Sequence, residues 1–225
     1  MKVQTFKQLK CFTYTYWIMK AKIIENYMKQ CNETGKRPIS VFQFCQSMEI
    51  TESEFYAEFP DLDAIDSSIL SEIFENVVSK LKTEEYYLEL SENDKLLTVM
   101  YAFFEQLKSV RSFLLVRLKD WKDPLQNLSM FKDFRKACMK FISTLDLGNP
   151  VKDIQMLNRI VDKGFSEMVF SNILFVLNFW INDRSSNFER TDACIEKSFS
   201  LTLNMLQNQT LSKALDFGKF LMQKD

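Results

Sequence analysis

Residues 39–66 constrain the fold of this 225-residue chain more than any other stretch, and they read ISVFQFCQSMEITESEFYAEFPDLDAID. Phe44 and Met48 lie four residues apart, which is the spacing of one face of a short helix. Thr51, followed three residues later by Glu54, is the pattern of a capping box that begins a second helix. Because only about two residues remain between Met48 and Thr51 for a turn, the segment predicts a helix-turn-helix.

The scarcity of glycine and proline indicates that the rest of the chain is helical too. The chain has four residues of each type while 46% of its residues are hydrophobic, so it lacks the turn residues that a strand-rich fold needs. A polar stretch at residues 83–93 marks the expected domain boundary. We therefore predict an all-α protein, with further helices at residues 20–31, 62–82, 94–108, 112–121, 125–145, 152–181, 188–208 and 211–222.

The order of residues in the helix-turn-helix segment resembles the DNA-binding signature of the TetR family of transcriptional regulators. The positions that carry the resemblance are Ser40, Phe44, Cys45, and residues 48–51, 55–59 and 62–65. The resemblance implies a TetR-like fold, in which a three-helix DNA-binding domain precedes a larger helical domain for ligand binding and dimerisation. On this chain it implies an N-terminal extension at residues 1–18, a helix-turn-helix domain at residues 19–66 with a linking helix at 62–82, and the larger domain at residues 83–225.

The same resemblance implies where DNA would be bound. Thr51, Ser53 and Tyr56 would contact DNA, with Lys36 and Arg37 on phosphate. The family's last two long helices form a two-fold four-helix bundle, which implies a homodimer through residues 152–181 and 188–208. A helix that is apolar on more than one face must pack against more than one neighbour. Besides a second subunit, the alternative neighbour is an ordinary core within one chain.

The segment departs from the family pattern in its charge. Glu49 stands where the family usually has glycine, and Leu62 where it usually has lysine. A carboxylate about 7 Å from a phosphate is repelled by ~0.6 kcal/mol in water and by about half of that in salt. Seven such carboxylates would oppose DNA binding by about 2–4 kcal/mol. The favourable free energy of non-specific DNA binding is about 5–8 kcal/mol. The segment has no Lys or Arg and seven acidic residues: Glu49, Glu52, Glu54, Glu58, Asp61, Asp63 and Asp66.

The abundance of large apolar side chains, 21 Phe and 11 Met, has two interpretations. It indicates either a bulky helical core or an adaptable cavity for an apolar ligand, and both can hold. If the second domain holds such a cavity, the residues we expect to line it are Met100, Phe103, Phe104, Phe113, Trp121, Phe134, Met168, Phe175 and Phe179.

The sequence lacks the usual chemistry of enzymes and metal sites. Histidine is absent, which removes the common general base and metal ligand. No glycine-rich phosphate loop or nucleophile elbow occurs, so we expect no catalysis, no cofactor and no metal. The cysteines are odd in number, form no C-x-x-C, and suit reduced, buried thiols: Cys11, Cys31, Cys45, Cys138 and Cys194. Residues 1–18 lack a signal-peptide cleavage pattern and the apolar run 168–181 is too short for a bilayer, so we expect a cytoplasmic protein.

Three functions follow from these patterns. The first is a ligand-responsive transcriptional regulator whose DNA binding is weakened or lost. The second keeps the TetR-like fold but carries an apolar metabolite or lipid without binding DNA. The third is a helical interaction module whose acidic face meets a basic partner.

Overall fold

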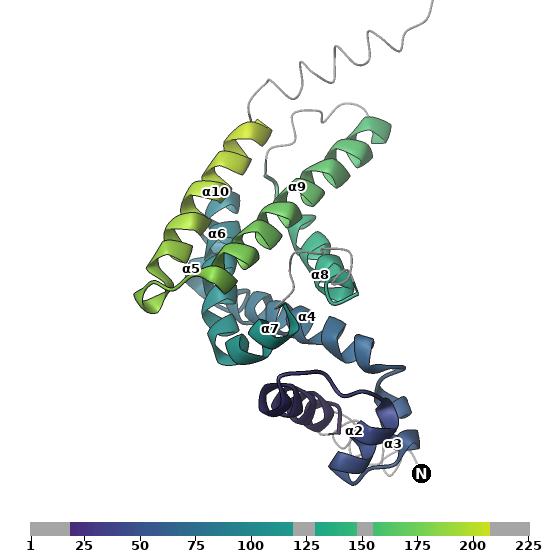
Figure 1. Ribbon diagram of the computed structural model, residues 1–225. Helices are drawn as coiled ribbons and strands as arrows, with labels where there is room; N and C mark the ends of the chain where they lie inside the picture. The colour runs from purple at the N-terminus through teal and green to yellow at the C-terminus, as the bar shows by residue number, and fades with distance from the viewer. Residues whose placement is uncertain (1–18, 119–128, 148–154, 208–225) are drawn as a thin grey trace, which may run out of the picture. The chain divides into compact units, whose positions relative to one another are not determined.

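The computed structural model describes residues 19–118, 129–147 and 155–207 (Figure 1). Every regular element in these ranges is helical, which confirms the all-α prediction. The first described helix covers residues 19–34. The elements that follow are α2 (Val41–Met48), α3 (Glu52–Glu58), α4 (Leu62–Leu81), α5 (Glu85–Leu88), α6 (Glu92–Leu107), η1 (Lys108–Val110), α7 (Arg111–Arg117), α8 (Lys132–Ile142), α9 (Gln155–Asn182), η2 (Ser186–Phe188) and α10 (Glu189–Gln207).

The predicted helices that fall on described residues are found, with differences at their ends. The polar stretch 83–93 was expected to be a joint, but it contains the short helix α5 and the start of α6, which Ser91 caps by accepting from the Asp94 N–H at 3.2 Å. The predicted helix at 211–222 lies outside the described residues, as do the end of the one at 112–121, the starts of those at 125–145 and 152–181, and residue 208.

The chain divides into two compact units. The first takes the residues up to Glu72 together with Val110–Phe134, and the second takes Ile73–Ser109 and the residues from Arg135 onward. Helix α4 contributes to both, because the division falls between Glu72 and Ile73.

An aromatic cluster forms the core of the first unit. Tyr27, Phe44 and Phe55 are fully buried. Their rings meet edge-on, at 5.9 Å between the centroids of Tyr27 and Phe44 and 6.0 Å between those of Phe44 and Phe55. Phe113 of α7 joins the cluster at 6.1 Å from Tyr27. These contacts fix α2 against α3 and both α2 and α7 against the helix at residues 19–34, since edge-to-face pairs add to the free energy of burial itself.

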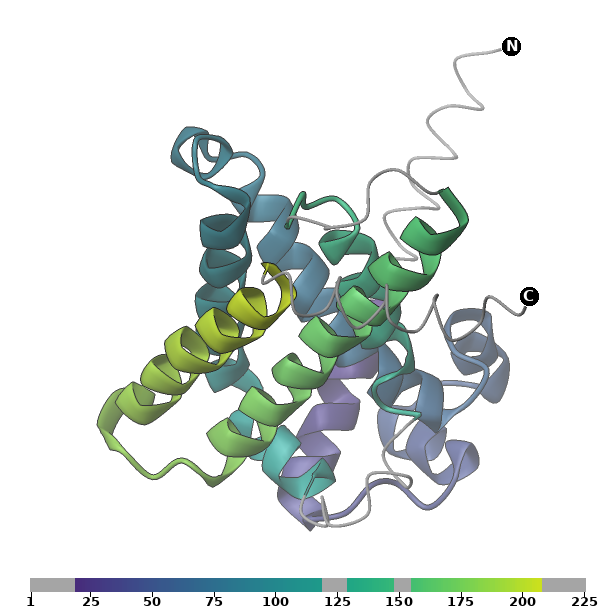
Figure 2. The ribbon, with the colours of Figure 1, turned by 90° about the horizontal axis from the view of Figure 1, so that it is seen from above.

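The second unit is built around α6, whose inward residues are buried along its whole length. Phe103 meets Phe74 of α4 at 5.4 Å, and Phe104 meets Trp180 of α9 at 6.3 Å, both as edge-to-face pairs. Helix α10 packs against α9 and α6, and Figures 1 and 2 both show it beside α6 and joined to α9 by a short loop.

Helix α9 contains the most apolar stretch of the described residues. Gly164–Asn182 has 19 residues and a mean hydropathy of 1.4, so it is longer than the run 168–181 seen in the sequence and passes a membrane-span test by length and composition. The core helix of a soluble protein can have the same length and composition. Ile173, Val176 and Trp180 are fully buried, and 39% of the stretch is buried in all. The packing of α9 against α10 and Phe104 accounts for its apolar inner face.

Candidate functional site

The turn of the helix-turn-helix ends α2 with a left-handed residue. Glu49 has φ 56° and ψ 38°, and its N–H donates to the carbonyl of Gln46. The next N–H, from Ile50, donates to the carbonyl of Cys45 at 3.1 Å, which completes a Schellman motif. Glu49 therefore adopts the conformation that glycine provides at this place in the family signature, although a side chain makes it less favourable.

Helix α3 begins with the capping box that the sequence predicts. The Glu54 N–H donates to Thr51 Oγ1 at 3.2 Å, and the Thr51 N–H donates to the Glu54 carboxylate at 2.8 Å. These hydrogen bonds from the backbone and hydroxyl of Thr51 lower the pKa of Glu54. The carboxylate of Glu54 therefore has a structural role at the start of α3.

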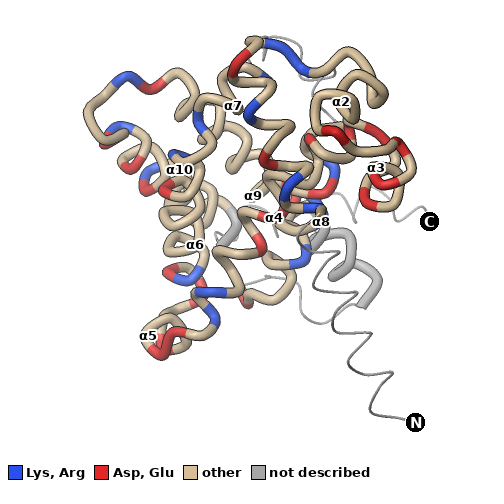
Figure 3. Tube along the Cα trace, turned by 90° about the horizontal axis from the view of Figure 1, so that it is seen from below, with Lys and Arg blue, Asp and Glu red and all other residues tan. Residues whose placement is uncertain are grey.

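Four of the five residues predicted to contact DNA are exposed. Lys36 precedes α2, Thr51 caps α3, and Ser53 and Tyr56 lie on α3, with Tyr56 52% exposed. The fifth, Arg37, donates from Nη1 to Asp63 Oδ1 at 2.7 Å instead of standing free. Figure 3 shows acidic positions along α3, and neither α2 nor α3 contains a Lys or Arg.

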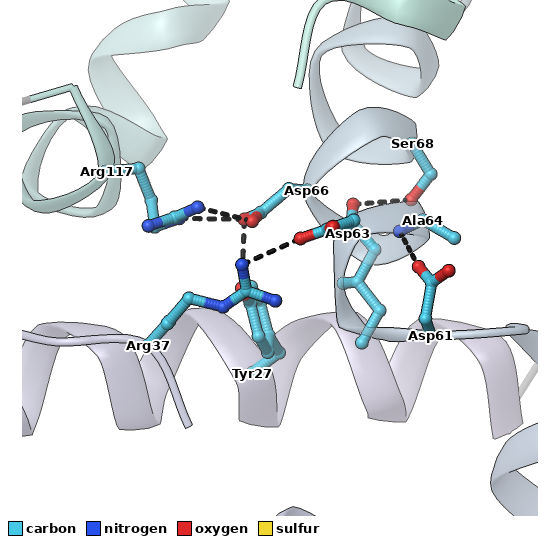
Figure 4. A network of polar contacts seen from close by, with 9 residues as sticks. Tyr27, Arg37, Asp61, Asp63, Ala64, Asp66, Ser68 and Arg117 are labelled. Atoms are coloured by element: carbon cyan, nitrogen blue, oxygen red, sulfur yellow. Dashed lines mark hydrogen bonds and ion pairs between the residues drawn. The ribbon is translucent and has the colours of Figure 1, made fainter. Parts of the chain in front are cut away.

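A buried polar network joins α4 to α7 and to the helix at residues 19–34 (Figure 4). Asp66 is only 1% exposed. Arg117 holds its carboxylate with two hydrogen bonds, from Nε to Oδ1 at 3.0 Å and from Nη2 to Oδ2 at 2.6 Å. The Tyr27 hydroxyl donates to Oδ1 at 3.0 Å. This network was not predicted from the sequence. Asp66 is one of seven acidic residues in its segment, and its partner Arg117 is 51 residues away.

The network shifts the acidity of its neighbours. Burial alone would lower the pKa of Arg117, but the hydrogen bonds and charge of Asp66 raise it above its ordinary value. Burial and then the Asp66 charge raise the pKa of Tyr27, and the same two causes raise the pKa of Cys31 to about 11. Tyr27 and Cys31 therefore stay protonated near neutral pH, and Cys31 is a poor nucleophile.

The structure reduces the repulsion expected from the seven acids. Asp66 is neutralised by Arg117 and Asp63 by Arg37. Asp61 accepts the Ala64 N–H at 2.8 Å in the first turn of α4, so it has a structural role there as Glu54 has in α3. At least two of the seven carboxylates are therefore paired with a cation, which lowers the repulsion estimated for seven acids facing DNA. The expectation of seven opposing charges was therefore too high.

The residues predicted to line a ligand cavity are divided between the two units. Met100, Phe103 and Phe104 fill the core of the second unit, whereas Phe113 and Phe134 are fully buried in the first. Of the others, Trp121 lies outside the described residues and Met168 is half-buried on α9.

Among the described residues of the second unit, two clefts are large enough to hold a small molecule. Phe175 and Phe179 line one of about 290 Å³ at the end of α9, where the Arg190 guanidinium lies 5.8 Å from the Phe179 ring centroid. The other measures about 370 Å³, lies between α4 and α8, and is lined by none of the predicted residues. Within the residues that the structure describes, no group of three or more His, Cys, Asp or Glu is placed to hold a metal ion.

The sequence matches the family described as "Tetracyclin repressor-like, C-terminal domain" over residues 95–221. No curated protein matches the chain. The family match covers more than half of the chain and excludes residues 39–66, so it is independent of the helix-turn-helix that first indicated this family. The chain belongs to the tetracycline repressor-like, or TetR, family.

Proposed function

We propose that this protein is a ligand-responsive transcriptional regulator of the cytoplasm that binds DNA through α3. The observation that carries the proposal is the helix-turn-helix itself, since Ser53 and Tyr56 project from an α3 whose start is fixed by a capping box. In helix-turn-helix proteins, the second helix of the motif lies in the major groove, and its exposed side chains contact the bases.

The charged residues in and just before the helix-turn-helix determine how strongly this DNA binding should depend on salt concentration. Among the predicted phosphate contacts only Lys36 is exposed and without an ion pair within the described residues, because Arg37 is held by Asp63. Counterion release makes log K fall with log salt by about 0.9 for each phosphate neutralised. A dimer that neutralises about two to four phosphates should therefore show a slope of only about −2 to −4.

The experiment is selection of a site from random duplex DNA, followed by titration over a range of salt concentrations. Lys36→Gln should make the slope shallower by about 2 in a dimer, and Tyr56→Ala should weaken binding at every salt without changing the slope. Lys80→Gln, at the far end of α4, is the matched control and should change neither. If no duplex is bound even at low salt, the regulator is excluded.

The outer faces of α9 and α10 support a dimer as the binding species. Each carries a stripe with spacings of four and three residues, the repeat of coiled-coil helices. The stripe on α9 includes Met168, Ser171 and Phe175, and that on α10 includes Ser198, Leu201 and Met205. Phe175, Leu201 and Met205 are 55%, 62% and 56% exposed, which is unusual for side chains of this size.

Light scattering tests the dimer. Leu201→Glu and Phe175→Glu should each convert the protein to a monomer, because each buries a charge in the apolar seam of the two-fold bundle. Leu88→Glu is the matched control, since Leu88 is equally exposed at 60% but lies on α5. A monomer in the unmutated protein, or dimers in all three variants, would exclude this interface.

The absence of Lys and Arg from α2 and α3 favours a second candidate, a TetR-fold carrier of an apolar metabolite. This candidate predicts a co-purified small molecule and no DNA binding. Native mass spectrometry of gently purified protein tests it, and an empty protein that binds duplex DNA would exclude it.

A further inference from the structure

The cleft between α4 and α8 combines an apolar floor with a basic rim. It lies entirely within the second unit and measures about 370 Å³. Helix α4 contributes Phe74, Glu75, Val78 and Ser79, and Lys82 follows its last residue. The segment from Ala137 to Thr144 contributes Ala137, Lys140, Phe141 and Thr144.

The floor of the cleft is a fixed aromatic surface. Phe74 and Phe141 are 1% and 4% exposed, and their rings meet edge-on at 5.7 Å. Phe74 also packs at 5.4 Å against Phe103, in the core of the unit. A ligand would therefore meet a preformed apolar wall, which lowers the cost of ordering the site on binding.

The rim carries two ammonium groups and one carboxylate. Lys82 and Lys140 are exposed, and neither forms an ion pair with any residue that the structure describes. The carboxylate is that of Glu75, seven residues before Lys82, which places their backbones about 10 Å apart along the α4 axis. The lining thus has a net charge of +1, and its acid stands two turns from Lys82.

We propose that this cleft binds an amphipathic carboxylate, whose alkyl chain covers Phe74 and Phe141 and whose head group pairs with Lys82 and Lys140. A neutral apolar molecule would leave both ammonium groups unused, and a cation would be repelled by them. At roughly 30 Å³ for each small group, the cleft holds about twelve non-hydrogen atoms, the size of a ten-carbon fatty acid. The inference rests on the proposed function in one respect, because it names the ligand class to which the regulator would respond.

Each lysine also has a simpler role. Both lie at or near the C-terminal ends of their helices, where a positive charge offsets the helix dipole. That role needs no ligand and gives no preference between an acid and an alcohol of equal chain length. Binding selectivity therefore separates the two roles.

The test is calorimetric titration of the full chain with decanoate, decanol and decylamine at low salt and neutral pH. We expect decanoate to bind at least tenfold more tightly than decanol, the factor that one charge-assisted contact supplies, and decylamine to bind more weakly than either. In the variant Lys82→Gln/Lys140→Gln, the affinity for decanoate should fall to that for decanol, and the affinity for decanol should be unchanged. Lys80→Gln, a nearby lysine outside the lining, should keep the full preference.

A filled cleft provides a test that does not depend on charge. Ala137 is 6% exposed and lines the cleft, so Ala137→Met should weaken decanoate and decanol alike. Equal affinities for decanoate and decanol in the unmutated protein, or a preference that survives Lys82→Gln/Lys140→Gln, would overturn the proposal. The titration contains no DNA, so a failure of DNA binding leaves its outcome unaffected.

Discussion

Asp66→Asn should destabilise the first unit more than any other single charge removal in the described part of the helix-turn-helix region. The carboxylate is 1% exposed and accepts two hydrogen bonds from Arg117 and one from Tyr27. Asparagine keeps the shape and one acceptor oxygen, but it leaves the Arg117 guanidinium, whose side chain is 19% exposed, without its counter-charge.

The magnitude follows from the cost of an uncompensated buried charge. Removing one partner of a buried pair costs about 3–5 kcal/mol, and because Arg117 keeps some access to water we expect about 3 kcal/mol for Asp66→Asn. That is a large part of the 5–15 kcal/mol by which domains are stable. Arg117→Met should cost a similar amount, and the double variant should cost about 2 kcal/mol less than the sum of the two.

Urea unfolding followed by circular dichroism measures these values. The matched control is Asp63→Asn, because the pair of Asp63 with Arg37 has side chains 53% and 38% exposed and should contribute less than about 1 kcal/mol. The reasoning is refuted if Asp66→Asn costs no more than Asp63→Asn, or if the two network substitutions are additive.

Two further predictions concern single residues. Glu49→Gly should stabilise the protein by about 0.5–1 kcal/mol, because glycine removes the strain at φ 56°, whereas Glu49→Ala keeps that strain and should change the free energy of unfolding by less than about 0.5 kcal/mol. Burial raises the pKa of Cys31 from its ordinary value of 9.0 to about 11, so the thiol contributes stability that is present below pH 9 and lost as pH rises toward 11. The loss should be about 2–3 kcal/mol and should be smaller in Cys31→Ala, measured as the slope of unfolding free energy against pH. Equal slopes in the two proteins would contradict this explanation.

The sequence predicted the helix-turn-helix well because its signals are local. The capping box of Thr51 and Glu54 needs three residues of separation, and Pro60 stands directly between the end of α3 and the start of α4. Short elements were harder to predict, since the four residues Glu85–Leu88 are too few for a period to be recognised and they lie in a polar stretch.

The candidate site was less predictable because it depends on contacts far apart in the sequence. Phe103 and Phe104 were expected near a ligand, yet the structure uses them to fill the core, and a large apolar side chain looks the same in sequence in either role. The cleft was not seen, because its exposed lysines resemble any solvated lysine until Phe74 and Phe141 are found beneath them. Asp66 shows the same limit, since its burial depends on Arg117.

Helix α4 suggests how ligand binding in the cleft would be coupled to DNA binding by the helix-turn-helix. Asp66, in the network of the first unit, and Lys82, on the rim of the cleft, lie on or just past one continuous helix. They are separated by sixteen positions, which correspond to about 24 Å of helix axis. A ligand that favours one position of this helix shifts the equilibrium only by its difference in affinity between the two positions.

That coupling must be reciprocal, which gives the last prediction. If saturating decanoate changes the Kd for duplex DNA by some factor, saturating DNA must change the Kd for decanoate by the same factor, in the range of about 5–150 for typical coupling. Lys82→Gln/Lys140→Gln should raise the decanoate concentration that gives half of the response by at least tenfold and leave the Kd for DNA without decanoate unchanged. Fluorescence anisotropy for DNA and calorimetry for decanoate give the two factors independently. A response at the same decanoate concentration in this variant as in the unmutated protein would mean that decanoate acts on DNA binding from a site other than the cleft, because Lys82 and Lys140 are the cationic residues of its lining.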